Sequence, residues 1–485
     1  MNWSTISRNV GYALLVDALF MLLSVLIALT DPLDTALAPL AISFLLTFIV
    51  GAFPFIFVKK TSEISLKEGY VIIFFSWLLS FIFGMLPFAL WGGPFTVMNA
   101  WFESVSGFTT TGSSILSDVE SLPKALLFWR SSTHFIGGLG VVVFLLLIIP
   151  NTSQMRLRLT NLELSVLSRG AYHARTNRTV YIFTYVYLGL NASSFLLYWL
   201  AGMSPLDAIN HAFSVCATGG FSTRNLSIAS YGSLPITLIT MAYMFLASIH
   251  FGLIWLVLVS RSLKPLKNEV LRLYFSYLVI FSVIAGFVIK FTGSQESWGE
   301  SFLEGSFQML SYASTTGMAI EDNARFPFFL SMMMMLAGTV CGMAGSTTGG
   351  IKSDRLLLLL KSIRAHLHRA LHPNSITEVK YCGKNIGMPD MYPHILYIAI
   401  FGFVWLTSVL LTLMTGVDTR NAMMATLSSL GNVGPSVGEL GTFGNYGAQP
   451  DMAKFIYTLD MFLGRVEIYP VMAIFYMILG RNRRR

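Results

Sequence analysis

The sequence predicts an all-α polytopic membrane protein in which four helix–loop–helix repeats follow two N-terminal transmembrane helices. Three observations predict this class. Hydrophobic residues make up 54% of the 485 residues and charged residues only 12%, about half the share of a soluble domain. Long apolar runs recur along the whole chain, each near the ~20 residues that span hydrocarbon. A short motif rich in Ser, Thr and Gly recurs four times.

The apolar runs define the expected spans in chain order. They cover residues 10–30, 36–58, 70–91, 124–149, 179–201, 234–260, 272–292, 326–345, 392–416 and 452–480. The first run follows a lone Arg8 and is long enough to span, so we expect a retained helix rather than a cleaved signal peptide. An even number of spans leaves both termini on one side of the membrane.

Each copy of the recurring motif has a serine followed six residues later by a glycine. The copies read SGFTTTG, SVCATGG, SYASTTG and SSLGNVG, and they end at Gly112, Gly220, Gly317 and Gly434. Successive glycines are 108, 97 and 117 residues apart, a longer period than that of solenoid repeats. One chain therefore carries four copies of one unit, and four similar copies can surround one axis.

A segment too short to span the membrane precedes each motif. These segments begin near Thr96, Ser204-Pro205, Ser297 and Asp418, and the Ser-Pro pair has the residues favoured at an N-cap and first helical position. We expect each segment to be a half-helix that enters the membrane, stops and returns as extended backbone. Such backbone is tolerated at membrane depth only where protein or a water-filled cavity surrounds it. The repeats are therefore expected as helix–pore-loop–helix units in pseudo-fourfold arrangement around one pore.

These units divide the chain into five expected segments. They are an N-terminal two-helix addition at 1–60, repeat 1 at 61–150, repeat 2 with its preceding cytoplasmic loop at 151–261, repeat 3 with an intramembrane loop at 262–372, and repeat 4 with the basic C-terminus at 373–485.

Lysine and arginine gather on alternate connections and on the two tails. Most of the 32 lie at Arg8 and within 59–67, 156–178, 261–272, 352–384 and 481–485, so the positive-inside rule predicts that these segments and both termini are cytoplasmic. The opposite connections hold the acids Asp118, Glu120, Glu296, Glu300, Glu321, Asp322 and Glu439. The pore loops should then open outward through an acidic mouth. This topology accounts for the net charge of +8 without a nucleic acid partner.

The repeated motif has the residues that a dehydrated cation requires. A potassium filter replaces the ion's water with rings of backbone carbonyl oxygens, and glycine permits the backbone angles that point them inward. The candidate filter consists of Thr109, Thr110, Thr111 and Gly112; Ala217, Thr218, Gly219 and Gly220; Ser314, Thr315, Thr316 and Gly317; and Gly431, Asn432, Val433 and Gly434. The carbonyls expected to hold K⁺ are those of Thr110, Thr111, Thr218, Gly219, Thr315, Thr316, Asn432 and Val433. One such segment alone would be read as a turn between helices, but four in matching register favour a filter.

The eighth apolar run breaks into a glycine-rich stretch, residues 342–350, and resumes as a basic, leucine-rich helix from Ile351 to about Leu371. Glycines at this density cannot sustain a helix. Two interpretations follow: a loop at the cytoplasmic interface, or a plug that lies under the filter within the pore. The candidate gate residues here are Gly345, Ser346, Thr347, Thr348, Gly349 and Gly350.

Arg465 lies within the last apolar run. A charge there costs about 2.5–3.5 kcal/mol on insertion scales, so it should face a cavity or a partner. It could pair with Glu467 or Asp460 near an interface, or project into the pore and hydrogen-bond the glycine-rich stretch.

Three further polar residues fall within the membrane. Glu103, in the first half-helix, is the candidate partner of Arg130. Arg130 and His134 are one helical turn apart in the fourth run, where they could brace the first pore loop or its half-helix.

With these motifs the chain resembles the TrkH family, the membrane subunits of bacterial potassium uptake systems in the Trk/Ktr/HKT superfamily. The resemblance covers nearly the whole chain and rests on one filter glycine per repeat. Related plant proteins with serine at the first of these positions favour sodium, so Gly112 implies a preference for potassium. The family also has an intramembrane loop at the stretch matching 345–350, and an arginine matching Arg465 that hydrogen-bonds it.

The resemblance further implies a homodimer in the bacterial inner membrane, with one pore per protomer. It implies a cytosolic ring of TrkA-type subunits that bind nucleotide and control the gate, and this chain has no nucleotide-binding domain of its own. We expect the partner to dock on 151–178, 261–271, 351–391 and the tail. The expected partners are thus a second copy, TrkA-type subunits and lipid, with no covalent cofactor.

The function predicted from the sequence is potassium uptake through a selective, gated pore. Its driving force would be the membrane potential, about 2.3 kcal/mol per charge per 100 mV. The alternative is a secondary transporter that couples K⁺ to Na⁺ or H⁺, although such proteins typically consist of inverted halves. An enzyme would need a cluster of His, Cys or acidic residues at one depth, which the sequence does not suggest.

Overall fold

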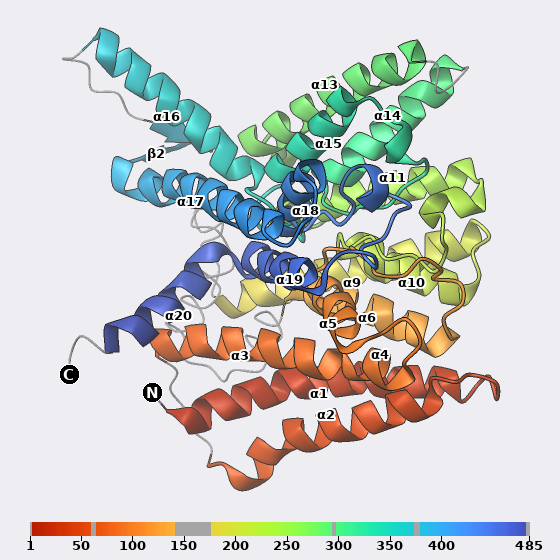
Figure 1. Ribbon diagram of the computed structural model, residues 1–485. Helices are drawn as coiled ribbons and strands as arrows, with labels where there is room; N and C mark the ends of the chain where they lie inside the picture. The colour runs from red at the N-terminus through yellow and green to blue at the C-terminus, as the bar shows by residue number, and fades with distance from the viewer. Residues whose placement is uncertain (1, 60–64, 141–175, 293–296, 373–378, 482–485) are drawn as a thin grey trace.

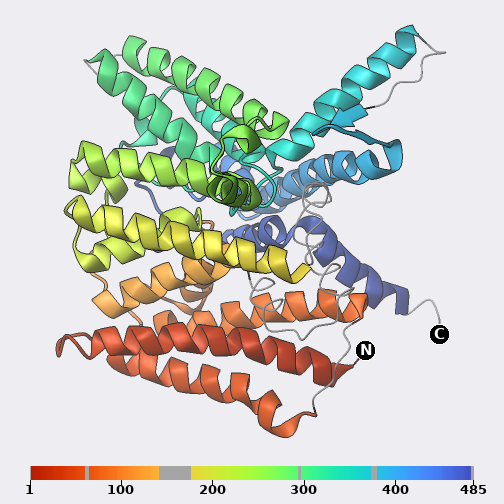
Figure 2. The ribbon, with the colours of Figure 1, turned by 180° about the vertical axis from the view of Figure 1, so that it is seen from behind.

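Long helices lie side by side through most of the molecule (Figure 1). The computed structural model describes residues 2–59, 65–140, 176–292, 297–372 and 379–481. Within these ranges five helices are long and apolar enough to cross a membrane, and a bent pair provides a sixth. Both termini lie at the same end of the molecule, as the views from front and back agree (Figures 1 and 2). The chain is therefore a multi-pass membrane protein.

Two antiparallel helices form the N-terminal edge (Figure 1). They are α1 (Trp3–Ala28) and α2 (Leu37–Phe57), and the first helix also contacts α3. Small residues allow this close approach, since a Cβ at Gly11 would lie only 2.6 Å from the carbonyl oxygen of Gly51.

The remaining helices follow one order four times, as the sequence predicts: a helix, a half-helix, extended chain and a second helix. In the last three groups a further helix follows the second one. The first group is α3 (Leu66–Gly84) with its short continuation α4 (Leu86–Trp91), then the half-helix α5 (Val97–Phe108) and the second helix α6 (Lys124–Leu139). The second is α9 (Thr176–Leu200), α10 (Pro205–Cys216), α11 (Leu234–Ser248) and α12 (Phe251–Ser260). The third is α13 (Glu269–Phe291), α14 (Trp298–Ala313), α15 (Phe328–Val340) and α16 (Ser353–Leu371). The fourth is α17 (Met388–Leu413), α18 (Thr419–Gly431), α19 (Asp451–Val466) and α20 (Ile468–Arg481).

Short elements join these helices. They are the 3₁₀ turns η2 (Ser227–Tyr231), η3 (Lys264–Leu266), η4 (Asn323–Arg325) and η5 (Gly438–Leu440), and the strands β1 (Val379–Tyr381) and β2 (Lys384–Ile386). The strands form an antiparallel hairpin in which Val379 pairs with Ile386. The sequence analysis did not predict this hairpin.

The half-helices α5, α10, α14 and α18 begin directly after the four predicted caps. The side chains of Thr96, Ser204 and Asp418 each accept a hydrogen bond from the backbone N–H three residues later. This bond satisfies one of the donors that a helix start leaves free. Ser297, the cap residue of the third half-helix, makes no such bond.

The second helix of each group is shorter than its apolar run. α6 ends at Leu139, and the rest of that run lies outside the described residues. α11 gives way to α12 at a bend of 102°, α15 ends at Val340, and α19 ends at Val466 before α20 begins. Left-handed backbone turns the chain at three of these ends, at Gly140, Cys341 and Glu467. The ten apolar runs are therefore not ten continuous helices.

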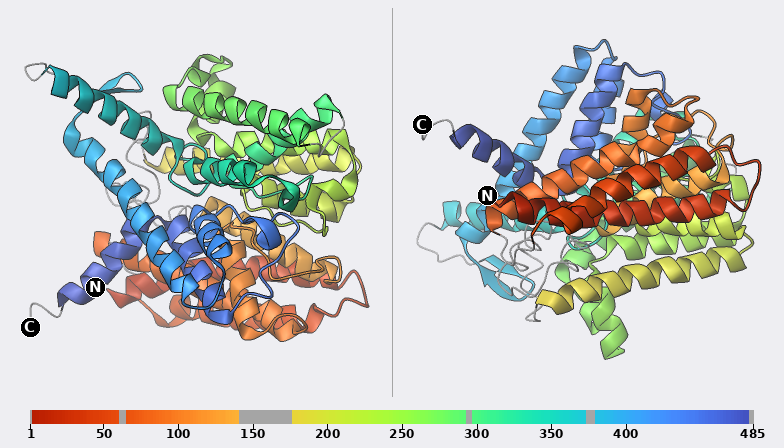
Figure 3. Two further views of the ribbon diagram at one scale, coloured as in Figure 1. Left: turned by 45° about the horizontal axis from the view of Figure 1, so that its top comes forward. Right: turned by 90° about the horizontal axis from the view of Figure 1, so that it is seen from below.

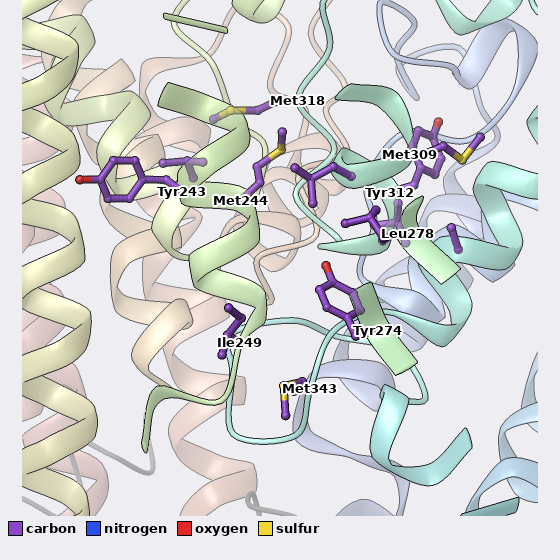
Figure 4. Packing of buried hydrophobic residues seen from close by; sticks show 14 of the residues in the cluster. Tyr243, Met244, Ile249, Tyr274, Leu278, Met309, Tyr312, Met318 and Met343 are labelled. Carbon is purple, nitrogen blue, oxygen red and sulfur yellow. The ribbon is translucent and has the colours of Figure 1, made fainter. Parts of the chain in front are cut away.

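Two of the helices that follow these breaks leave the line of the bundle. α16 diverges from α17 toward the end that holds the termini (Figures 1 and 2), and α12, in green, projects from the side (Figure 3). Buried side chains of α11, α13 and α14 pack together in one core (Figure 4). Met343, which follows α15, lies beyond Ile249 and Tyr274 at the end of this core (Figure 4). The glycine-rich stretch is thus part of the protein interior.

Candidate functional site

The four segments that carry the repeated motif, which the sequence analysis expects to be pore loops, meet in a closed ring. Their candidate filter glycines have positive φ angles of 84°, 84°, 72° and 100° in chain order. A Cβ added at Gly112, Gly220, Gly317 or Gly434 would lie 1.9, 2.1, 2.5 or 2.3 Å from the carbonyl oxygen of Gly219, Thr316, Val433 or Thr111, respectively. Each glycine therefore abuts the residue that precedes the glycine of the next loop, and the fourth loop closes on the first.

Left-handed backbone recurs two positions before each glycine. Thr110, Thr218, Thr315 and Asn432 have φ angles of 53°, 56°, 53° and 53°. A β-branched threonine is an outlier in this region, and such strain costs about 1–3 kcal/mol per residue and clusters at functional sites. The sequence pattern made these residues candidates for a filter, but it did not predict their conformation.

The motif serines anchor the ring. The backbone N–H groups of Thr111, Gly219, Thr316 and Val433 each donate to the carbonyl of their motif serine at 2.9 Å. The hydroxyls of Ser106 and Ser311 donate at 2.6 Å to the carbonyl seven residues on, and that of Ser428 does so at 3.0 Å. Ser214 instead lies 3.1 Å from His134 Nδ1. In three of the four repeats the motif serine thus holds the strand that returns past the glycine.

Most candidate filter residues are buried, and the ring faces a cavity. Gly112, Gly220 and Gly317 are half-buried, while Gly434 is buried. All four line a cavity of about 90 Å³ together with residues of the connections that follow the loops. This cavity is the mouth of the ring.

The glycine-rich stretch lies against the ring. Thr218 Oγ1 donates to the carbonyl of Thr347 at 2.9 Å, and the N–H of Gly349 donates to Thr315 Oγ1 at 3.1 Å. A Cβ at Gly349 would lie 2.4 Å from the carbonyl oxygen of Gly431. Residues 345–350 are buried except for the half-buried Ser346. The stretch therefore contacts three of the four pore loops, which is not the arrangement of an exposed loop at the membrane surface.

Arg465 hydrogen-bonds this stretch. Its Nη1 donates to the carbonyl of Thr347 at 2.6 Å, and its Nη2 donates to the carbonyl of Gly137 at 2.6 Å. The alternative acids have other partners, since Glu467 pairs with Arg355 at 2.8 Å and Asp460 accepts from Ser408 at 2.6 Å. Of the two arrangements that the sequence left open for Arg465, the structure contains the contact with the glycine-rich stretch.

Arg465 also lines a second cavity of about 80 Å³. Its lining includes residues 345–348, Lys352 and Glu467, together with Gly138 and Gly140 at the end of α6. The glycine-rich stretch therefore has the ring on one side and this second cavity on another.

Asp354 and Tyr381, which the sequence analysis missed, hold the N-terminal end of the glycine-rich stretch. Asp354 accepts a hydrogen bond from the N–H of Ala344 at 2.5 Å. Tyr381, in the β-hairpin, donates its hydroxyl to the same carboxylate at 2.8 Å. The position of Asp354 in a basic helix after the glycines was the available signal, but its partner Tyr381 lies in an element that was not predicted.

Glu103 and Arg130 form the buried ion pair that the sequence predicts, with Nε and Oε1 2.6 Å apart. Glu103 also accepts from the N–H of Ile115 at 3.1 Å, and Arg130 donates to the carbonyl of Ser222 at 3.2 Å. The arginine lies over the ring of Phe221, 3.4 Å from its centroid. The pair therefore connects the strands that follow the first and second filter glycines.

His134 braces a different loop from the one expected. Its imidazole stacks on Phe221 at 4.0 Å and contacts Ser214, both of the second repeat. A Cβ at Gly219 would lie 2.4 Å from its Nδ1. The expectation for the first pore loop was therefore wrong for His134, since the fold brings α6 against α10.

The mouth is less negative than the acid count suggests. Arg224 lies 3.6 Å from Glu120 and 3.0 Å from Asp207, and Arg325 lies 3.2 Å from Glu321. Glu296 lies outside the described residues, as do Arg156, Arg158, Arg169 and Arg175 of the basic connections and Arg483, Arg484 and Arg485 of the tail. In the described part of the chain, no group of three His, Cys, Asp or Glu side chains could hold a metal ion.

Comparison with known proteins agrees with this architecture. The family model of TrkH, described as a cation transport protein, matches residues 38–292 and 292–483. Potassium uptake protein TrkH of the Trk system of Salmonella typhimurium is 31% identical over 422 residues, which is 86% of each chain. TrkH of Vibrio parahaemolyticus is 30% identical over 486 residues and 98% of each chain, and TrkG of Escherichia coli is similar to the same extent.

A solved structure agrees as well. The crystal structure of the potassium transporter TrkH from Vibrio parahaemolyticus superposes with a TM-score of 0.88 at 29% identity, over 98% of both chains. These relatives are transport proteins rather than enzymes. On this evidence the chain belongs to the TrkH family of cation transport proteins.

Proposed function

We propose that this chain is the potassium-conducting membrane subunit of a bacterial Trk-type uptake system. The observation that carries the proposal is the closed ring, in which each filter glycine lies so near a carbonyl of the next loop that a Cβ on the glycine would be within 2.5 Å of the oxygen. Four such contacts in cyclic order are what one ion path along a fourfold axis requires. The names of the relatives, which are potassium uptake proteins, support potassium as the ion.

Selectivity would come from the backbone of the ring. The carbonyls of Thr111, Gly219, Thr316 and Val433 form one layer, and those of Thr110, Thr218, Thr315 and Asn432 form the next. Positive φ two residues before each glycine and at the glycine itself supports this assignment, because alternating backbone conformations turn successive carbonyls to one side. The C-termini of α5, α10, α14 and α18 immediately precede the ring, and their dipoles would add partial negative charge for a cation.

Gating would depend on the glycine-rich stretch and on Arg465. The stretch is bonded to the second and third pore loops, so an ion that leaves the ring would meet its backbone. The fixed charge of Arg465 beside Thr347 would raise the barrier to a cation. Conduction therefore requires the stretch to move away from the ring.

The family relation supports the remaining assembly. We infer a homodimer in the bacterial inner membrane with one pore per protomer, both termini in the cytoplasm, and control by TrkA-type nucleotide-binding subunits. Residues 261–271 and 351–391 are rich in lysine and arginine, and such a partner would dock on the described part of these segments. α16 and the hairpin belong to this region, and Tyr381 connects it to the glycine-rich stretch through Asp354.

Ion flux in liposomes that contain only this chain tests the proposal. We expect potassium-driven flux that favours K⁺ over Na⁺, needs no second ion gradient and loses selectivity in Gly317→Ser, whose Cβ would lie 2.5 Å from the Val433 carbonyl. Gly402→Ser is the matched control, because a Cβ at Gly402 meets nothing within 4 Å. Flux that appears only with a Na⁺ or H⁺ gradient would instead identify a coupled transporter.

A further inference from the structure

A large apolar cavity opens on the side of the molecule, away from the ring. Its volume is about 800 Å³, and α9, α11, α12 and α13 surround it. The 102° bend between α11 and α12 creates this space, because α12 projects from the bundle instead of continuing along it (Figure 3). Aromatic and aliphatic side chains such as Trp255, Leu258 and Phe275 dominate the lining.

Two cations lie at this cavity. Lys267, just after η3, and Arg272, in the first turns of α13, both line it, and both are exposed. Neither forms an ion pair with another residue in the described ranges. The carboxylate of Glu269, in the first turn of α13, is close enough to interact with Arg272, but it forms its ion pair with Lys361. The cavity thus combines an apolar body with two cations outside any ion pair in the described ranges.

We propose that this cavity binds an anionic phospholipid, with one acyl chain between α11 and α12 and its headgroup phosphate on Lys267 and Arg272. The apolar walls alone would not select one lipid, because lipid tails are as apolar as leucine. Selection comes from the two cations, since basic pockets between transmembrane helices bind anionic headgroups.

The same bend is bonded to the glycine-rich stretch. Ile249 lines the cavity, and two residues later the N–H of Phe251 donates to the carbonyl of Gly345 at 3.0 Å. The ring of His250 fills the space beside Gly345, where a Cβ would lie 2.6 Å from it. A lipid that supports the bend therefore holds the start of α12 and the carbonyl of Gly345 in the arrangement described. This consequence rests on the proposed gating function, but lipid binding itself does not.

Fluorescence of Trp255 reports occupancy directly. The full chain is reconstituted in phosphatidylcholine vesicles that contain a small fraction of lipid with brominated chains, which quench tryptophan on contact. The Trp255→Phe variant, measured in parallel, isolates the contribution of Trp255 by difference. We expect brominated phosphatidylglycerol to quench Trp255 at a lower mole fraction than brominated phosphatidylcholine. Each of the two basic residues should lower the mole fraction needed for the same quenching by about fivefold.

Matched variants identify the binding groups. The pair Lys267→Gln and Arg272→Gln should remove the preference for phosphatidylglycerol, whereas Lys264→Gln, a nearby basic residue outside the lining, should keep it. Gly189→Phe should reduce quenching by both lipids, because Gly189 lines the cavity and a Cβ there meets nothing within 4 Å. Gly402→Phe, at an equally open glycine in α17, should have no effect.

The quenching measurements can overturn the lipid proposal in two ways. Equal quenching by the two lipids, or a preference that survives loss of both cations, would overturn the proposal. Absence of any quenching of Trp255 would also overturn it and would point to a second copy of the chain in the cavity. If the chain conducts potassium, flux should fall as phosphatidylglycerol replaces phosphatidylcholine, and the Lys267/Arg272 variant should lose this response. A chain that does not conduct would still give the quenching result, so failure of one proposal is distinguishable from failure of the other.

Discussion

Arg465 donates to the carbonyl of Thr347 at 2.6 Å, and the hydroxyl of Thr218 donates to the same oxygen at 2.9 Å. The carbonyl of Thr347, in the glycine-rich stretch, is thereby held between α19 and the second pore loop. The hydroxyl of Thr347 adds bonds to the carbonyls of Cys216 and Ala247, at 3.1 and 3.2 Å. These bonds must break if the stretch moves away from the ring.

We predict that Arg465→Ala raises potassium flux. The substitution removes a charge-assisted hydrogen bond, worth about 1.5–3 kcal/mol, from the state in which the stretch lies against the ring. The fraction of open molecules should then increase by roughly tenfold or more. Flux is measured in liposomes at equal protein content, with Arg465→Lys expected between the wild type and the alanine variant. Flux that is unchanged or lower in Arg465→Ala would contradict the gating role.

Thr218→Val tests the other bond to the same carbonyl. Valine keeps the shape of threonine but cannot donate to Thr347, so we expect flux to rise by roughly fivefold for a bond worth about 1 kcal/mol. Thr110→Val is the matched control. Thr110 occupies the equivalent position in the first loop, and its hydroxyl has no hydrogen bond to the glycine-rich stretch in the described structure. A rise of the same size in both variants would mean that the effect arises in the ring rather than in the stretch.

The Glu103–Arg130 pair should matter for stability. Both side chains are at most 3% exposed, so removal of one partner leaves an uncompensated charge and should cost about 3–5 kcal/mol. We expect Arg130→Met to lower the thermal unfolding temperature in detergent, and Glu103→Gln combined with it to recover part of the loss. Lys124→Gln, which breaks the exposed pair with Asp31, should leave the thermal unfolding temperature nearly unchanged, because solvent screens an exposed pair. Similar losses from both pairs would contradict the assignment.

Tyr381→Phe tests the connection between the β-hairpin and the glycine-rich stretch. In this variant Asp354 keeps the hydrogen bond from Ala344 but loses the one from the tyrosine hydroxyl. We expect faster hydrogen exchange at the backbone N–H of Ala344 and neighbouring residues, by roughly tenfold for a bond to a charged group. Tyr392→Phe, at an exposed tyrosine of α17, should leave this exchange unchanged. Equal exchange in Tyr381→Phe and the wild type would show that the hairpin does not influence the stretch.

The starts of the half-helices were predictable, but the breaks in the long helices were not. Ser204 and Asp418 are strong cap residues, and their local chemistry determines where a helix begins. The residues on both sides of Ile249 and His250 are apolar, so hydropathy stays high across this point and gives no sign of the bend of 102°. That bend depends on the contact between Phe251 and Gly345, nearly a hundred residues away, which no local pattern encodes.

The candidate site shows the same division. The cost of a buried charge reduced the options for Arg465 to two, and one of them is present. The strained conformation of Thr110 could not be predicted, because β-branched residues avoid left-handed backbone unless tertiary contacts impose it. The partner of His134 was equally hidden, since Ser214 is 80 positions away.

The ring closes within a single polypeptide, and this has a consequence for how its properties can change. In an assembly of four identical subunits, any substitution enters at all four corners at once. Here the corners are already unequal, since three of them carry Thr110, Thr218 and Thr315 and the fourth carries Asn432, whose side chain donates to Thr111 of the neighbouring loop. One mutation alters one corner and leaves three intact. If the ring conducts as proposed, we expect a single substitution to change ion preference through one corner of the ring, with the other three corners unchanged.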